Sequence, residues 1–388
     1  MRLPEPYSAH YGVVPLPPPE EPILLTSALP TLRAAGAVLA RVSTLAAELE
    51  DPFIVSRVLP RREAVSSSAI EGTNSTLDEL LQVEEGDGAA SDAARQVRDY
   101  ATALDALLPR ARQQGHGFFQ PAVVEELHRA VMKSDIAYQD KPGALRDGVV
   151  WIGGRGDISN STYNPAPPAT IAASLADSMT YLRCEGMQGV NQHLIARMAI
   201  GHAHFEAVHP FRDGNGRVGR LLLPLMMAAE GHVPLYLSPY IEANRMDYYA
   251  ALKAAQRQLD WNAVVGFVGK AVTGTVDELM TTRDALTQLR RAWQRRGKFR
   301  GNSAASNALD VVPHYPVLTI NRLKQVLGVS FPAARTAINY LTSLGILEER
   351  TGYQRNRIFV SSEALAIINR PFGDAPNLPA EPDEARGQ

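Results

Sequence analysis

Cysteine is almost absent from this sequence. Cys184 is the only one in 388 residues, which excludes a disulfide framework within the chain and a metal site made of paired thiolates. A long apolar run is also missing: the longest, Leu221–Ala229, is far shorter than the roughly 20 residues of a membrane-spanning helix. The proline-rich first residues lack the apolar core of a secretory signal. We therefore expect a soluble, cytoplasmic protein.

An excess of charge of one sign is missing as well. The 39 Lys and Arg residues nearly balance the 41 Asp and Glu residues, which leaves a formal charge of −2. No global field therefore draws the chain toward nucleic acid or membrane, and any such affinity has to be local. The apolar fraction of 45% is sufficient for ordinary globular cores. The length suits two or three domains.

Apolar residues at three- and four-residue spacing predict a mainly helical protein. The predicted helices cover residues 32–49, 92–108, 119–132, 172–182, 192–208, 216–230, 246–259 and 261–289. One strand-like segment, residues 148–152, is flanked by glycines and followed by the proline-rich segment 164–168. We expect it to form a hairpin that projects from the helical body. The basic, glycine-containing stretch 290–301 predicts a domain boundary.

Beyond that boundary the pattern predicts two helices and a hairpin, at residues 319–327, 331–344 and 346–360. This order resembles a winged helix-turn-helix. Its candidate contact residues are Arg335, Thr336 and Asn339 on the second helix and Arg350, Arg355 and Arg357 in the hairpin. DNA readers need a basic face to neutralise phosphates, and this one is only mildly basic. DNA contact and protein docking both remain open interpretations.

One short segment, residues 209–220, brings together groups that suit the binding of phosphates. Gly214 and Gly216 let the backbone approach a phosphate closely, and the free N–H groups of the following helix face the same charge. Arg217 and Arg220 lie three residues apart on one helical face, where guanidinium groups can hold neighbouring phosphate oxygens. This inventory predicts phosphoryl or nucleotidyl transfer.

The same loop carries groups for metal binding and proton transfer. Asp213 can supply an oxygen ligand to a magnesium ion that bridges phosphates. His209 titrates near neutral pH and can accept a proton from an incoming hydroxyl. One alternative is an ordinary structural loop in which the histidine is only a cap. Another is a zinc site of His202, His204, Glu206 and His209, but these residues lack the spacing of a zinc-binding helix and a separate fourth ligand.

Residues 209–220 resemble the signature of the Fic family: a histidine, an aromatic, an acidic residue, then Gly-Asn-Gly-Arg and a second arginine three positions later. The similarity extends over residues 62–272. The resemblance implies an adenylyltransferase with a Fic-type helical core. His209 would deprotonate a Ser, Thr or Tyr hydroxyl of a target protein or of the enzyme itself, and that hydroxyl would attack the α phosphate of ATP. Asp213 would hold Mg²⁺. The residues implied to bind the phosphates are Gly214, Asn215, Gly216, Arg217 and, for the γ phosphate, Arg220.

Two flanking regions extend the resemblance. One is similar to the flap that aligns a target segment by strand addition, and its residues are Val149, Val150, Trp151, Ile152 and Gly153. The other resembles the family's nucleoside wall, with Tyr248 as the stronger candidate, then Tyr249, and with Gln256 as an adenine contact. A plain surface hairpin and a packed pair of core tyrosines are the alternatives.

Ser67, Glu71 and Gly72 resemble the inhibitory motif of many Fic proteins. The resemblance implies that Glu71 pairs with Arg220, takes the place of the γ phosphate and keeps ATP in an unproductive pose. Taken alone, the segment is better explained as an ordinary helix end with Gly72 as its cap. Beside the loop signature, and N-terminal to the core as in one class of Fic proteins, the inhibitory interpretation becomes the better one.

We therefore predict a mainly α protein with a Fic core, a β-hairpin flap and a winged-helix domain. The expected divisions are an N-terminal helical region with the inhibitory helix (1–115), the catalytic core (116–272), a helical linker (273–303), the winged helix (304–370) and a disordered tail (371–388). A rival hypothesis is a DNA-binding regulator whose core senses nucleotide. A third is a Fic enzyme that removes AMP or moves another phosphate-containing group. Homodimer formation is left open.

Overall fold

The computed structural model describes residues 1–48, 56–86, 91–186, 193–352 and 356–379. The described chain is mainly helical with two small antiparallel sheets, which confirms the predicted fold class. No helix of the described ranges is long and apolar enough to cross a membrane.

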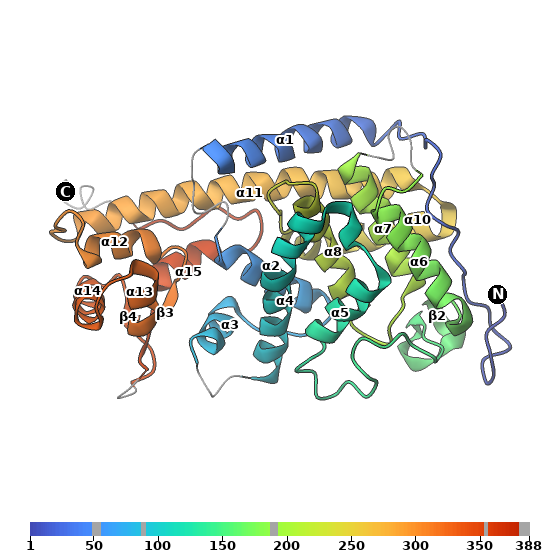
Figure 1. Ribbon diagram of the computed structural model, residues 1–388, viewed down its shortest axis with the longest axis horizontal. Coiled ribbons are helices and arrows are strands. Elements are labelled where there is room, and N and C mark those ends of the chain that lie inside the picture. Colours follow the sequence, from blue (N-terminus) through green and yellow to red (C-terminus); the bar gives the residue numbers. More distant parts are fainter. Residues whose placement is uncertain (49–55, 87–90, 187–192, 353–355, 380–388) are drawn as a thin grey trace, which may run out of the picture.

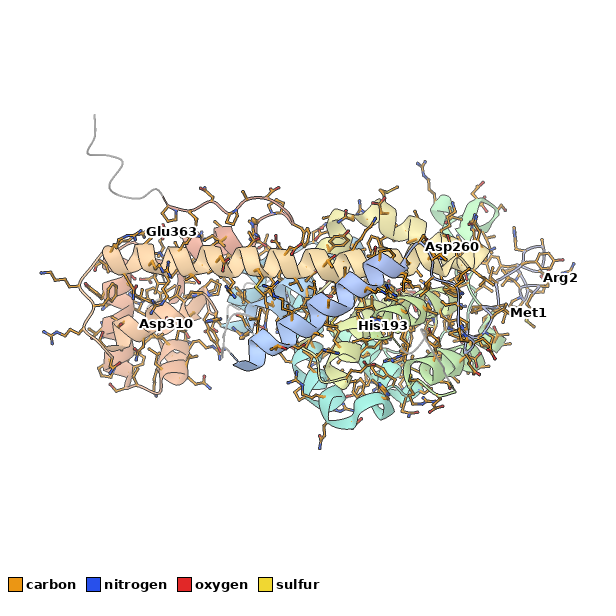
Figure 2. All side chains as sticks on the ribbon, turned by 90° about the horizontal axis from the view of Figure 1, so that it is seen from above. Met1, Arg2, His193, Asp260, Asp310 and Glu363 are labelled. Atoms are coloured by element: carbon orange, nitrogen blue, oxygen red, sulfur yellow. The ribbon has the colours of Figure 1, made fainter. Side chains whose placement is uncertain are left out.

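The longest element is α11 (Trp261–Arg295), which runs along the length of the molecule (Figure 1). Helix α1 (Leu29–Glu48) packs against it, and so do α7 (Leu194–Val208) and α10 (Arg245–Gln258). Seen from above, Asp260 at the start of α11 and Glu363 near its other end lie far apart (Figure 2).

The predicted end of this helix at residue 289 is wrong, because the helix continues to Arg295. Trp293 is fully buried, and its indole N–H donates to Glu363 at 2.7 Å. Burial of this large side chain against the C-terminal module carries the helix through the basic stretch. The expected division at 272/273 therefore falls within a continuous helix.

Helix α2 (Val58–Ile70) lies against α4 (Asp92–Gln114), α8 (Asn215–Ala229) and α9 (Ser238–Ala243). Its Glu63 is buried and accepts hydrogen bonds from the Ser238 backbone N–H at 2.8 Å and the Ser238 hydroxyl at 2.6 Å. Helix α3 (Leu77–Glu84) follows through a capping box in which Thr76 and Glu79 bond each other's backbone N–H groups. Glu63 thus ties α2 to the start of α9, and the capping box fixes the start of α3.

The central helices are α7 and α8, joined by the loop 209–214. Every residue of α7 is buried, which explains its lack of an amphipathic pattern. Helices α5 (Pro121–Val131) and α6 (Ile171–Leu182) pack beside this pair, α5 on α8 and α6 on α7.

A hairpin lies toward the end of the molecule opposite the C-terminal module (Figure 1). Its strands are β1 (Ile152–Gly153) and β2 (Ser161–Tyr163), antiparallel, with an irregular register between the two residues of β1. The strand predicted at 148–152 is therefore wrong in its bounds. Part of the reason is that Arg146 Nη1 binds the Gly148 carbonyl at 3.0 Å, so this backbone group bonds to a side chain instead of a partner strand.

The C-terminal module places α12 (Ala304–Val311), α13 (Ile320–Leu327), α14 (Phe331–Ser343) and α15 (Ser362–Ile368) around a small sheet. Its strands are β3 (Val317–Thr319), β4 (Glu348–Glu349) and β5 (Ile358–Val360), in the order β3-β5-β4. Phe372 packs edge-on against Tyr240, with ring centroids 5.4 Å apart. The disordered tail predicted from residue 371 is thus wrong at this residue, and residues 380–388 lie outside the described ranges.

Candidate active site

The loop between α7 and α8 turns sharply at His209, whose backbone lies in the left-handed region with φ 52°. The buried side chain of Asn215 closes the loop. Its Nδ2 donates to the Phe211 carbonyl at 2.8 Å, and its Oδ1 accepts the Phe211 N–H at 2.8 Å. The predicted phosphate ligand Asn215 therefore uses its amide to hold the loop, which leaves its backbone N–H, at the start of α8, as the group available to an anion.

Two glycines let other groups come close to the start of α8. Gly214 has φ +78°, which favours glycine at the N-cap. At Gly216, a Cβ would stand 2.0 Å from Glu71 Oε1. The Glu71 carboxylate thus occupies the space directly above the backbone where the sequence predicts a phosphate.

Arg220 on α8 meets the end of α2. Its Nη2 donates to Glu71 Oε1 at 2.7 Å and to the Ser67 carbonyl at 2.8 Å, and its Nε donates to Ser67 Oγ at 2.9 Å. Burial would raise the pKa of Glu71, but the Arg220 guanidinium outweighs it and holds this pKa below its ordinary value. The structure thus brings together the two residues whose pairing the resemblance implies.

A cavity of about 580 Å³ opens beside this pair. It is lined by residues from the end of α2, from α7, the loop, α8 and α10, and from the hairpin region: Glu71, Trp151, Ile152, Thr162, Tyr163, Glu206, His209, Gly216, Arg220, Tyr248, Tyr249, Leu252, Lys253, Gln256 and Arg257. Cationic and aromatic groups face one volume, which suits a phosphorylated aromatic ligand.

Of the predicted nucleoside wall, Tyr248, Tyr249 and Gln256 all line this cavity. Tyr248 is only 3% exposed, and its hydroxyl lies 2.7 Å from His202 Nε2. Tyr249 is 44% exposed. The structure therefore favours Tyr249 as the more accessible of the two rings. Of the predicted flap, Trp151 and Ile152 line the cavity, whereas Val149, Val150 and Gly153 do not.

The sequence suggests that His209 titrates near neutral pH, but the structure places its pKa lower. Burial, aided by the nearby Arg146 guanidinium, lowers the pKa of His209 to about 4. The imidazole is therefore neutral at pH 7 and able to accept a proton. Its backbone carbonyl accepts a hydrogen bond from Arg146 Nε at 2.8 Å, which fixes the turn.

Arg217 is buried, with Nη2 3.2 Å from Met132 Sδ and 3.7 Å from Asp213 Oδ2. Within the described part of the chain, its Nε and Nη1 have no hydrogen-bond partner. A buried guanidinium with free donors is costly unless a ligand satisfies them. These unpartnered donors are consistent with the predicted role of Arg217 as an anion ligand.

The Asp213 side chain is 60% exposed, and its Oδ1 accepts the Gly214 N–H at 2.6 Å. The described residues contain no group of three or more His, Cys, Asp or Glu side chains that could hold a metal ion. A preformed metal centre therefore does not fit these residues. Magnesium that arrives with substrate phosphates needs only one or two protein carboxylates, and a single exposed carboxylate fits that case.

The zinc alternative involves histidines that have other contacts. His202 meets Tyr248, as described above, and His204 Nδ1 lies 2.7 Å from Ser178 Oγ. Burial lowers the pKa of His202 to about 3 and that of His204 to about 4, so both are neutral. These histidines act as packed polar residues of the core.

Several residues at the site are not predicted from the sequence, apart from the mention of Glu206 in the zinc alternative. Glu206 lines the cavity while only 8% exposed, and burial raises its pKa to about 8. Lys253 and Arg257 belong to the α10 wall, and Arg257 Nη2 donates to the Thr162 carbonyl of the hairpin. His128 packs under the loop. None of these residues belongs to a sequence motif. For Lys253 and Arg257, the sequence offers only their helical spacing from Tyr249, which places all three on one face of α10.

Comparisons with known proteins match two family models to this chain. The model for the N-terminal region of the Fic/DOC family matches residues 29–107, and the model for the Fic/DOC family itself matches residues 118–227. Together these segments hold α2, the loop and all of α8 except its last two residues.

Curated relatives match over part of their length. A protein adenylyltransferase fic-1 from Caenorhabditis briggsae is 35% identical over 130 residues, which are 34% of this chain and 23% of the relative. A probable protein adenylyltransferase from Aquifex aeolicus (strain VF5) is 32% identical over 99 residues, which are 26% of this chain and 28% of the relative. The chain thus spans about a quarter of the length of these relatives.

Solved structures share the fold. A Fic family protein from Desulfovibrio desulfuricans G20 aligns with a TM-score of 0.54 at 23% identity, over 89% of this chain and 98% of the other. A Fic domain containing signaling protein from Bacteroides thetaiotaomicron VPI-5482 aligns with a TM-score of 0.51 at 17% identity, over 66% of this chain and 97% of the other.

Proposed function

Because this chain carries the N-terminal domain and the Fic domain of the Fic/DOC family, we propose that it is a protein adenylyltransferase. It transfers AMP from ATP to a Ser, Thr or Tyr hydroxyl of a protein, itself included. One observation carries the proposal: a neutral imidazole, His209, faces the same cavity as Gly216 and Arg220 at the start of α8.

In this reaction His209 accepts the proton of the acceptor hydroxyl. The hydroxyl oxygen forms a bond to the α phosphorus as the bond from that phosphorus to the bridging oxygen breaks, and pyrophosphate leaves with the electron pair. The low pKa of His209 keeps the ring unprotonated at neutral pH. A neutral ring in contact with the acceptor is the form that the step requires.

In this proposal the phosphates bind to the backbone N–H groups at the start of α8. The unpartnered Nε and Nη1 of Arg217 supply further donors to them. Asp213 would hold the Mg²⁺ that accompanies ATP. When bound, that ion would neutralise negative charge on the phosphates. In this proposal Tyr249 and Gln256 contact the adenine, and Lys253 and Arg257 add positive charge to the same wall.

Glu71 restrains the enzyme. Its carboxylate already occupies Arg220 and the space above Gly216. A γ phosphate that uses this guanidinium has to displace a charge-assisted hydrogen bond. ATP that binds with Glu71 in place therefore adopts a pose that does not lead to transfer.

The hairpin receives the target segment. Ile152 is exposed and lines the cavity. Within the described residues β1 pairs only with β2, so its other edge has no partner strand and could accept one. Main-chain pairing places an acceptor hydroxyl near His209 while tolerating varied side chains. Because the chain has a single cysteine, a reducing compartment such as the cytoplasm suits it.

The C-terminal module is better explained as a structural support for the α3 region than as a DNA-binding domain. Three of its arginines are engaged within the chain: Arg322 with Glu85, Arg350 with Asp78 and Arg357 with Glu349. The first two of these pairs hold the α3 region, next to the Glu71 turn. Arg335 is exposed, and Arg355 lies outside the described residues. Retention on DNA that falls steeply with salt would argue against this interpretation.

Removing the base tests the function. We expect His209→Ala to abolish transfer of label from α-labelled ATP while ATP binding, measured by calorimetry, stays close to that of the parent. The two readouts separate because the imidazole handles the acceptor proton and the α8 N-terminus handles phosphates. Labelling of the folded variant at the parent level would remove His209 from the reaction.

A further inference from the structure

His128 lies on α5, one turn before its end, and is fully buried. Its Nδ1 accepts the Gly143 backbone N–H at 2.8 Å, and its Nε2 lies 3.0 Å from the Asp213 backbone carbonyl oxygen. Since an amide N–H can only donate, Nδ1 must be the unprotonated nitrogen. The ring hydrogen is therefore on Nε2 and is donated to the Asp213 carbonyl.

The ring also supports the loop by direct packing. It stacks on Phe211 with centroids 3.8 Å apart and planes 8° from parallel. A Cβ at Gly214 would lie 3.3 Å from His128 Cδ2 and 2.8 Å from Met132 Sδ. The backbone at Gly214 thus packs closely against the side chains of His128 and Met132, with no space for an added methyl group.

The direction of the Asp213 carboxylate depends on this peptide. The side chain is 60% exposed, and its one short hydrogen bond, at 2.6 Å, comes from the N–H of the next residue. A rotation of the peptide would therefore carry the carboxylate with it. The contact with His128 opposes that rotation.

The same contact links the carboxylate to the base. Gly143, which donates to His128, lies three residues before Arg146. Arg146 donates from Nε to the His209 carbonyl at 2.8 Å and from its backbone N–H to the Pro210 carbonyl at 3.0 Å. Residues 143–146 therefore hold the start of the loop directly and its Asp213 end through His128.

We propose that His128 is a positioning residue that orients the Asp213 carboxylate toward magnesium bound with ATP. The identity of that ligand rests on the proposed function. His128 touches neither nucleotide nor acceptor and acts through the Asp213 carbonyl. Residues that orient a metal-binding carboxylate influence metal affinity by about 10- to 100-fold.

Two substitutions separate the two ring nitrogens. In His128→Gln the amide nitrogen replaces Nε2 and can still donate to the Asp213 carbonyl. In His128→Asn the amide oxygen replaces Nδ1 and can still accept from Gly143, but the donor to Asp213 is lost. The two variants each keep one of the two hydrogen bonds and both lose the ring stack on Phe211, so they form a matched pair for stability.

The experiment measures ATP binding by calorimetry as a function of magnesium concentration, in a Glu71→Gly background. We expect His128→Asn to raise the magnesium concentration for half-maximal ATP binding by at least about tenfold and His128→Gln to change it by less than about threefold. Unfolding temperatures of the two variants should be similar. AMP transfer is recorded in parallel and should follow the magnesium shift.

The proposal would be overturned if both variants needed the same magnesium concentration for half-maximal ATP binding. That holds whether this concentration equals that of the parent or is raised in both together with a lower unfolding temperature. His128 would then be a packing residue. A rise of at least about tenfold in the magnesium concentration for half-maximal ATP binding, seen only in His128→Asn, upholds it. If that selective shift appears in a chain that transfers no AMP, the positioning role stands and the proposed function fails. The binding readout thus distinguishes the two failures.

Discussion

Arg220 Nη2 donates a hydrogen bond to Glu71 Oε1 at 2.7 Å across 149 residues of sequence. The same oxygen would lie only 2.0 Å from a Cβ at position 216. One carboxylate therefore occupies both the guanidinium and the backbone surface that a nucleotide phosphate would use. Access of ATP to its productive pose becomes a competition for this single position.

Glu71→Gly should raise the rate of AMP transfer about tenfold, because the γ phosphate no longer displaces a charge-assisted hydrogen bond. Tenfold corresponds to about 1.4 kcal/mol, within what one such contact contributes. Glu71→Gln keeps the size but not the charge and should give a smaller gain. Initial rates of self-modification with α-labelled ATP measure both.

The control for this prediction is the double variant Glu71→Gly with Arg220→Ala. If the gain works through the guanidinium, the double variant stays inactive. A gain that survives the loss of Arg220 would mean that Glu71→Gly acts by loosening α2 rather than by freeing the arginine.

Asp213→Ala should lower the magnesium dependence of ATP binding and abolish transfer, whereas Asp213→Glu should retain part of both. The reason is that an exposed carboxylate beside the phosphate site supplies a hard oxygen ligand. Calorimetric titration of ATP at several magnesium concentrations measures the effect. An unchanged titration for Asp213→Ala would remove this residue from the metal site.

Glu206 should make folding stability depend on pH. Burial raises its pKa to about 8, so between the ordinary carboxyl pKa and pH 8 the folded state holds a proton that the unfolded state has released. Its contribution to stability is fully present below the ordinary pKa and is lost as pH rises through 8. The stability difference between Glu206→Gln and the parent should therefore shift in favour of the variant from pH 5 to pH 8, by at most about 4 kcal/mol. Urea unfolding at the two pH values measures it, and an equal difference at both would contradict the burial argument.

Asn215→Ala should lower the free energy of unfolding by about 2 kcal/mol, since it removes two buried hydrogen bonds to Phe211. The rate of AMP transfer should fall more than the loss of folded protein accounts for, because the loop then loses the two hydrogen bonds that hold its shape. Asn215→Asp keeps the acceptor for the Phe211 N–H but places a carboxylate against the Phe211 carbonyl, so it should not rescue activity. Full activity in either variant would show that the loop holds its shape without this amide.

How far the sequence predicts this molecule depends on whether the partners of a residue are close in sequence. The loop residues from His209 to Arg220 are predictable because their chemistry and spacing lie within one segment. The pairing of Glu71 with Arg220 is predictable only through the family resemblance. The mainly helical fold follows from apolar periodicity.

The features that escape prediction depend on tertiary surroundings. The low pKa of His209 comes from burial and from Arg146. The high pKa of Glu206 comes mainly from burial. Helix α11 continues because Trp293 finds Glu363 in a distant segment. His128 stands on an ordinary amphipathic helix, and nothing in its neighbourhood marks its contact with Asp213.

The most direct test of the account compares ATP labelled at the α phosphate with ATP labelled at the γ phosphate, using the Glu71→Gly protein with magnesium. Adenylyl transfer predicts stable label on the protein from the α position and none from the γ position, and loss of that label in Glu71→Gly with His209→Ala. Label from the γ position, or α label that persists without His209, would contradict it.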